Sequence, residues 1–100
     1  MDRFHELKIM LAVVDAGGFA KAASRLNSSP PAVTRAISGL EARLGVEIFA
    51  RTTRSVHLTE AGRVLAERAR AVLADLEAAE KEASGEAAVP TGLLTITASV

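Results

Sequence analysis

The chain has 100 residues, no cysteine and a formal net charge of zero. This length suits one small domain with an appended segment, and so small a core gains stability from a partner chain. Without cysteine the chain can form neither a disulfide nor a thiolate metal site, which fits a reducing cytoplasm. The N-terminus is charged where a signal peptide needs an apolar run, and no run is long enough to span a bilayer, so we expect no membrane association.

The zero net charge hides an asymmetry along the chain. Residues 19–58 contain six basic and two acidic residues, whereas residues 59–100 contain four basic and seven acidic residues. Residues 1–18 carry a net charge of −1. A basic middle segment is typical of a protein that binds a polyanion, so residues 19–58 are the predicted nucleic-acid-binding part.

Apolar residues at helical spacing predict two helices before residue 27. The first spans residues 2–16 and ends at the pair Gly17-Gly18. Its predicted apolar face consists of Phe4, Leu7, Leu11 and Val14. The second covers about two turns, and its apolar positions are Phe19, Ala22, Ala23 and Leu26.

A third helix has well-marked ends. Ser29 is a suitable N-cap, and Pro30 suits the first helical position because its missing N–H is not needed there. Gly45 is the predicted stop. The apolar face is formed by Val33, Ile37, Leu40 and Leu44.

A small hairpin and a long helix follow. Val46–Ala50 and Val56–Leu58 are β-prone and flank a basic, hydroxyl-rich tip. Thr59 is the predicted cap of a helix that continues to about Ser84 and ends at Gly85.

The last residues predict a connection to further structure. Residues 86–92 have the composition of a linker, and Leu93–Thr97 alternates as a β-strand does. A single strand has no pairing partner here, and an unpaired strand is not stable by itself. We therefore expect this chain to be part of a longer protein.

The second and third helices form a predicted helix-turn-helix over about residues 19–38. An α-helix fits the major groove of DNA, and the N-terminal residues of a recognition helix reach base edges. The candidate contacts lie opposite the apolar face of the third helix: Pro30, Pro31, Thr34, Arg35 and Ser38. The two prolines predict apolar contact with thymine methyl groups, whereas the polar side chains can hydrogen-bond to bases or phosphate. The alternative is an αα-hairpin that binds nothing.

The hairpin tip is a second candidate contact. Arg51, Thr52, Thr53 and Arg54 can reach phosphate or an adjacent minor groove. The alternative for this tip is a solvated turn.

The fourth helix indicates dimerisation. A helix of about 26 residues is about 39 Å long, more than so small a domain can cover. Its apolar stripe nevertheless persists to the end: Ala61, Leu65, Ala69, Val72, Leu76, Ala79 and Ala83. The same helix of a second chain is the simplest partner, and a missing domain is the alternative. The predicted dimerisation residues are Leu65, Ala69, Val72, Leu73, Leu76 and Ala79.

Several ordered motifs over about residues 2–88 resemble those of LysR-type transcriptional regulators. They are Phe19-(x2)-Ala22-Ala23-(x2)-Leu26, SPPAVTRAI from Ser29, LEARLG from Leu40, FARTTR from Phe49 and LTEAG from Leu58. The resemblance implies a mainly α fold: a winged helix-turn-helix of three helices plus a two-stranded wing in residues 1–58, followed by a long dimerisation linker helix in residues 59–85. Residues 86–100 would then be the hinge and first strand of a missing effector-binding domain.

The resemblance also implies partners. Such regulators are bacterial, cytoplasmic and associated with the nucleoid, and they bind an interrupted palindromic promoter site as dimers or tetramers. They repress or activate transcription, with RNA polymerase as an expected partner and a small-molecule effector bound by the domain absent here; this chain itself needs no cofactor.

The resemblance places contacts with bases and backbone at Ser29, Pro31, Thr34 and Arg35, and a minor-groove arginine at Arg54. The chain departs from the family where Pro30 replaces a glutamine that reads bases, and where Gly18, Ala20 and Ser28 replace more usual residues.

Two other functions compete with this interpretation. An enzyme is disfavoured because His5 and His57 are far apart in sequence and no nucleophile, acid–base pair or metal-ligand cluster has suitable spacing. His57 is instead expected on the strand surface near DNA. A winged-helix module that binds protein rather than specific DNA is the stronger alternative, and it would lack the steep salt dependence of phosphate contacts.

Overall fold

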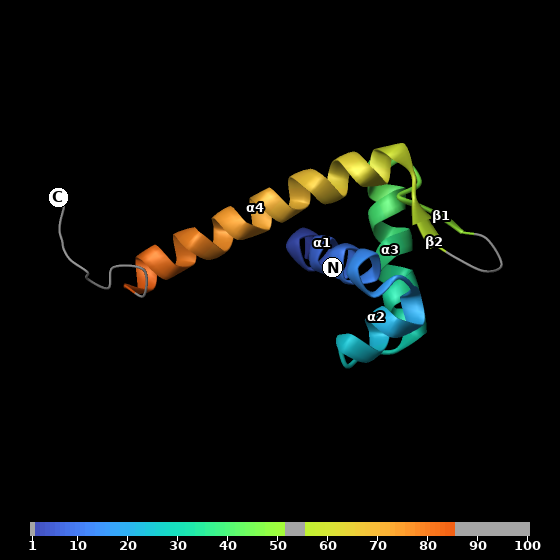
Figure 1. Ribbon diagram of the computed structural model, residues 1–100, viewed down its shortest axis with the longest axis horizontal. Coiled ribbons are helices and arrows are strands. Elements are labelled where there is room, and N and C mark those ends of the chain that lie inside the picture. Colours follow the sequence, from blue (N-terminus) through green and yellow to red (C-terminus); the bar gives the residue numbers. More distant parts are fainter. Residues whose placement is uncertain (1, 52–55, 86–100) are drawn as a thin grey trace. The chain divides into compact units, whose positions relative to one another are not determined.

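The computed structural model describes residues 2–51 and 56–85, and in these ranges the chain forms four helices and a two-stranded hairpin (Figure 1). The elements in chain order are α1 (Arg3–Ala16), α2 (Phe19–Arg25), α3 (Pro30–Leu44), β1 (Phe49–Arg51), β2 (Val56–Leu58) and α4 (Glu60–Ser84). The predicted order of helices and strands is therefore confirmed. The predicted linker and the strand Leu93–Thr97 lie outside the described residues.

The chain divides into two compact units after Arg70. The first unit holds α1, α2, α3, the hairpin and the part of α4 up to Arg70. The domain boundary predicted at residue 58 lies before this part of α4. None of the helices in the described ranges is long and apolar enough to cross a membrane.

Local chemistry explains where α3 begins and ends. The Ser29 hydroxyl accepts a hydrogen bond from the Ala32 N–H at 3.2 Å, as predicted for its N-cap. Gly45 ends the helix in the left-handed region at φ 74°, which a residue with a Cβ adopts at a cost. The caps thus confirm the third predicted helix over its whole length.

The core of the first unit is small and built from helix faces and the start of the wing. Its largest fully buried side chains are Met10, Val13, Val33, Ile37, Leu40 and Ile48. Leu44 at the end of α3 and Leu26 at the end of α2 are exposed, contrary to the sequence prediction. Both lie at helix termini, where the chain turns away from the core.

The buried face of α1 also differs from the predicted one. Ile9, Met10 and Val13 are buried, whereas Phe4 is 37% exposed. Leu7, Leu11 and Val14 pack only at the edge of the core. Because α1 carries apolar residues on nearly all sides, the helical period fits more than one face, and tertiary packing decides which is buried.

The wing is an antiparallel pair in which Phe49 lies opposite Leu58 and Arg51 opposite Val56. The predicted second strand, Val56–Leu58, is confirmed, but the first begins at Phe49 rather than at Val46. The side chain of Glu41 supplies the reason, because its carboxylate accepts hydrogen bonds from the backbone N–H groups of Ile48 and Phe49. A side chain thus occupies donors that a longer strand ladder would have used.

Candidate nucleic-acid interface

The helix-turn-helix consists of α2 and α3 packed through small and branched apolar residues. Ala22 and Ala23 of α2 are buried, and so are Val33 and Ile37 of α3. Between the helices, Asn27 adopts a positive φ of 56°, a conformation that asparagine tolerates better than most residues. The close contact of α2 with α3 therefore rests on residues that the sequence identified.

The face of α3 opposite the core carries the predicted contacts. Pro30, Pro31, Arg35 and Ser38 are exposed, Ser29 is exposed at the cap, and Thr34 is half-buried. The structure therefore brings together on one accessible surface the six predicted residues of the cap and recognition helix. We refer to the side chains of Ser29, Pro30, Pro31, Thr34, Arg35 and Ser38 together as the α3 face.

The first turn of α3 offers no free backbone donor. Pro30 and Pro31 have no N–H group. The Ala32 N–H is bonded to the Ser29 hydroxyl, and the Val33 N–H to the Ser29 carbonyl at 3.1 Å. This helix end therefore presents apolar ring surface instead of the N–H groups that usually bind phosphate at a helix N-terminus.

The wing carries the second group of predicted contacts, which begins at Arg51. The backbone of Arg51 lies in β1, while Thr52, Thr53 and Arg54 of the predicted tip lie outside the described residues. His57 is exposed on β2, where the sequence placed it. The rings of Phe19 and Phe49 meet edge to face with centroids 5.6 Å apart, so the wing is anchored to α2.

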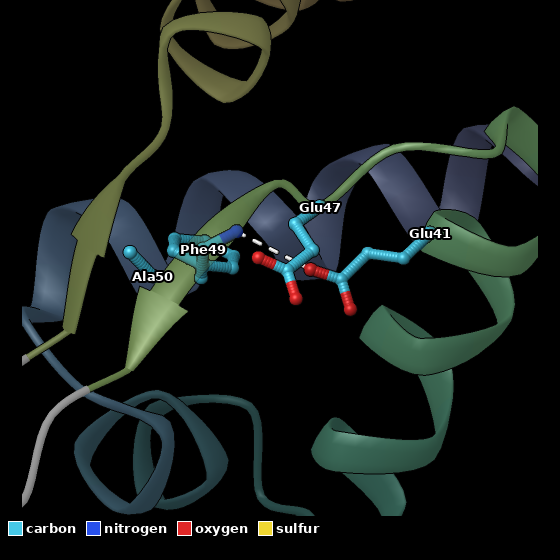
Figure 2. Close-up of a pocket in the computed structure, with 4 residues that line it drawn as sticks. All are labelled: Glu41, Glu47, Phe49 and Ala50. Atoms are coloured by element: carbon cyan, nitrogen blue, oxygen red, sulfur yellow. Dashed lines mark hydrogen bonds between the residues drawn. The ribbon is translucent and has the colours of Figure 1, made fainter.

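A shallow hollow of about 320 Å³ lies at the root of the wing. Figure 2 shows the carboxylates of Glu41 and Glu47 beside the backbone of Phe49, and Ala50 completes the lining. Glu41 Oε2 lies 2.8 Å from the Ile48 nitrogen and 3.3 Å from the Phe49 nitrogen. Two carboxylates make this hollow unsuited to phosphate, so we assign Glu41 to holding the wing on α3.

Sequence reasoning missed an ion pair between α1 and α3. Arg43 Nη2 lies 2.7 Å from Glu6 Oε1, and the Glu6 side chain is only 8% exposed. A buried carboxylate needs such a partner, because burial of an unpaired charge costs several kcal/mol. The residues are 37 positions apart, so no local sequence pattern pointed to the pair.

The predicted dimerisation residues of α4 have different surroundings. Ala69 is fully buried in the core of the first unit and Leu65 packs against that core, while the contact of both residues with a partner chain stays a prediction. Val72 is 45% exposed, Ala79 is exposed, and Leu73 and Leu76 are half-buried. The helical period alone could not distinguish a contact within the chain from a contact between chains.

No cluster of three or more histidine, cysteine or acidic residues in the described ranges could hold a metal ion.

Residues 4–63 match the family described as bacterial regulatory helix-turn-helix proteins of the lysR family. Among relatives, the transcriptional regulator TfdT of Cupriavidus pinatubonensis is 40% identical over 91 residues, which are 91% of this chain and 40% of TfdT. The regulator CrgA of Neisseria meningitidis serogroup B is 38% identical over 91% of this chain and 30% of its own length. The chain thus spans well under half the length of these relatives, and both are transcriptional regulators rather than enzymes.

Solved structures agree with this match. The DNA-binding domain of CbnR in complex with DNA is 39% identical with a TM-score of 0.80, covering 87% of this chain and 99% of that one. The BenM DNA-binding domain bound to benA site 1 DNA is 28% identical with a TM-score of 0.81, covering 90% and 100%. The chain therefore belongs to the LysR family of bacterial regulatory helix-turn-helix proteins and has the fold of their winged-helix DNA-binding domains.

Proposed function

We propose that this chain reads promoter DNA sequence-specifically for a transcription regulator, with the α3 face in the major groove. The observation that carries the proposal is the α3 face itself, where Arg35, Ser38 and Thr34 line the accessible side of a helix whose other side is buried. An exposed arginine in this position can bond to guanine in a bidentate manner or grip a phosphate. The excess of basic residues in positions 19–58 adds long-range attraction to DNA.

The start of the α3 face adds apolar readout to this proposal. Because Pro30 and Pro31 are exposed and this helix end has no free N–H, the chemistry that it matches best is the thymine methyl group. Replacing thymine by uracil removes only that methyl group. We expect substitution at one or two operator positions to weaken binding, and equal affinity after substitution at every position would contradict the apolar readout.

Arg35 provides the main test of DNA binding. A binding site is first selected from random double-stranded DNA, and affinity is then measured by fluorescence anisotropy over a range of salt concentrations. We expect Arg35→Ala to lose about 1–3 kcal/mol of discrimination at one base pair. Arg68→Ala on α4 is the control of equal charge and should change affinity little. A flat salt dependence of the unmodified chain would favour the protein-interaction module instead.

Dimerisation through α4 is the second part of the proposal. Val72, Leu73, Leu76 and Ala79 form an apolar surface on the part of α4 that follows the first unit. A second copy of this surface would cover it and would present two α3 faces to a two-fold DNA site. Sedimentation at increasing concentration should show self-association that Leu76→Asp abolishes, and a monomer at all concentrations would contradict this part.

For the full-length protein we propose the organisation that the family resemblance implies. The whole regulator would be a tetramer in the cytoplasm at the nucleoid, would respond to a small-molecule effector and would contact RNA polymerase. Residues 51–54 would add contacts with phosphate or the minor groove beside the α3 face.

A further inference from the structure

An ion pair joins α1 to α4 at the end of the first compact unit. Arg70 Nη2 donates a hydrogen bond to Asp15 Oδ1 at 2.6 Å, and both side chains are about half exposed. The two residues are 55 positions apart, so the contact is made only in the folded chain. It differs in this respect from the pair of Glu60 with Arg63, which are neighbours on α4 itself.

Asp15 lies where α1 by itself disfavours a carboxylate. It is the second-last residue of α1, whose last turn contains no basic residue. The C-terminal end of a helix carries partial negative charge and is stabilised by cations rather than anions. Even so, the hydrogen bond from Arg70 lowers the pKa of Asp15, and the charge of Arg25 on α2 acts in the same direction. Asp15 therefore serves the contact between elements and not the helix that contains it.

The contact between α4 and the first unit is made mostly by small residues. The residues by which α4 is buried are Gly62, Ala66 and Ala69, and no later residue of the helix is buried. Helix crossing angles are set by side-chain ridges that interlock, and a row of glycine and alanine forms only a shallow ridge. The directional hydrogen bond between Arg70 and Asp15 lies one residue beyond this row and adds a constraint on the orientation of α4.

We propose that Asp15 and Arg70 are positioning residues that fix the orientation of α4 on the DNA-binding unit and thereby the half-site separation that a dimer accepts. The inference rests on the proposed function, because it assumes that the α3 face reads DNA and that α4 pairs two chains. In such dimers the distance between recognition helices determines half-site spacing. A more loosely held α4 would therefore accept a wider range of spacings.

The test compares spacing selectivity with half-site affinity. The variants are Arg70→Gln, Asp15→Asn and the double variant, and Arg63→Gln is the matched control because it breaks an equally short pair within one helix. DNA duplexes carry one half-site or two half-sites at different separations. We expect single half-site affinity to stay unchanged and the preference for the best separation to fall about two- to fivefold, the range for an exposed ion pair. The double variant should lose no more than each single variant, since both break the same bond.

Two results would overturn the inference. One is unchanged spacing preference in Arg70→Gln, and the other is an equal loss in Arg63→Gln. If the unmodified chain did not bind single half-sites at all, that result would instead contradict the proposed function. Melting followed by circular dichroism shows whether each variant is folded.

A second measurement tests orientation without DNA or a dimer. Because the chain has no cysteine, spin labels can be placed at Lys21→Cys on α2 and Ala74→Cys on α4 without other changes. Labelled chain is diluted with unlabelled chain so that pulsed electron paramagnetic resonance reports distances within one molecule. Arg70→Gln should broaden the distance distribution relative to Arg63→Gln, and equal widths would overturn the inference.

Discussion

The two parts of α4 carry the same kind of apolar stripe but have different surroundings. From Glu60 to Arg70 the helix is buried at Gly62, Ala66 and Ala69 against the core of the first unit. After Arg70 no residue of the helix is buried, and Val72 is 45% exposed. The first part thus completes a domain, whereas in the second part Val72 is exposed and Leu73 and Leu76 are half-buried among the described residues.

This difference shows that one periodic pattern can serve two purposes along one helix. A row of small residues suits close packing on a preformed core, while Val72, Leu73 and Leu76 have the bulk that a helix pair needs. The following substitutions test the contrast by altering each part with the same kind of change.

The largest expected effect is that of Gly62→Ala. A Cβ at Gly62 would overlap the carbonyl oxygen of Ile48 and lie 2.9 Å from Leu58 Cδ2, so backbone would have to move. We expect a loss of about 3 kcal/mol in the free energy of unfolding, measured by urea denaturation. The control is Gly39→Ala in α3, where the Cβ would be 3.5 Å from Glu6 Oε2. Because alanine has the higher helix propensity, this variant should gain about 0.5–1 kcal/mol in the free energy of unfolding. Equal stability of both variants would mean that α4 does not approach Ile48 so closely.

A smaller effect is expected from inserting bulk at alanine. Ala69→Leu adds a large side chain at a fully buried position and should cost about 2 kcal/mol. Ala79→Leu makes the same change at an exposed position and should shift stability by no more than about 0.5 kcal/mol. Thermal melts of both variants at low concentration give the comparison. A large loss in Ala79→Leu would show that this part of α4 is covered within the chain.

Removing a hydroxyl group at the start of α4 should destabilise the fold more than removing one at its end. The Thr59 hydroxyl accepts a hydrogen bond from the Gly62 N–H at 3.0 Å and donates to the Glu47 carbonyl at 2.6 Å, so it caps the helix and ties it to the wing. We expect Thr59→Ala to cost about 1 kcal/mol, with Thr59→Ser recovering most of it. The Ser84 hydroxyl donates a hydrogen bond to the Lys81 carbonyl of its own helix, and Ser84→Ala should cost less than about 0.5 kcal/mol. Equal losses in urea denaturation would contradict this view of the cap.

The sequence predicted the elements that local chemistry determines. Ser29 and Thr59 cap their helices and Gly45 ends α3 as expected, because each acts on residues within one turn. The apolar residues of α3 fit only one helical face, and that face is buried as predicted except at Leu44, where the helix ends. In α1 the apolar residues surround the helix, so only the tertiary contacts decide that Met10 and Val13 are buried.

The candidate site could be predicted to a similar extent. The α3 face follows from the same helical period, since residues opposite a buried stripe must be accessible. The groups that hold this face in place could not be predicted, because Glu6 meets Arg43 and Glu41 meets Ile48 only through the fold. The burial of Ala69 could not be predicted for the same reason, since its neighbours are residues of its own core.

The smallest expected effect concerns the pair that ends the first part of α4. The hydrogen bond from Arg70 holds the pKa of Asp15 below its ordinary value of 3.8, so the folded chain favours the carboxylate. The stabilisation is complete above the ordinary pKa and is lost as the pH falls through the lowered pKa of the folded chain, because protonation removes the ion pair. Both side chains are about half exposed, so the gain is small and weakens in salt. Melting temperatures of the unmodified chain and Arg70→Gln should therefore differ slightly at neutral pH and converge below about pH 4. Arg68→Gln removes the same charge from an exposed position and should show no convergence, whereas a pH-independent difference in Arg70→Gln would show that Arg70 acts through packing and not through Asp15.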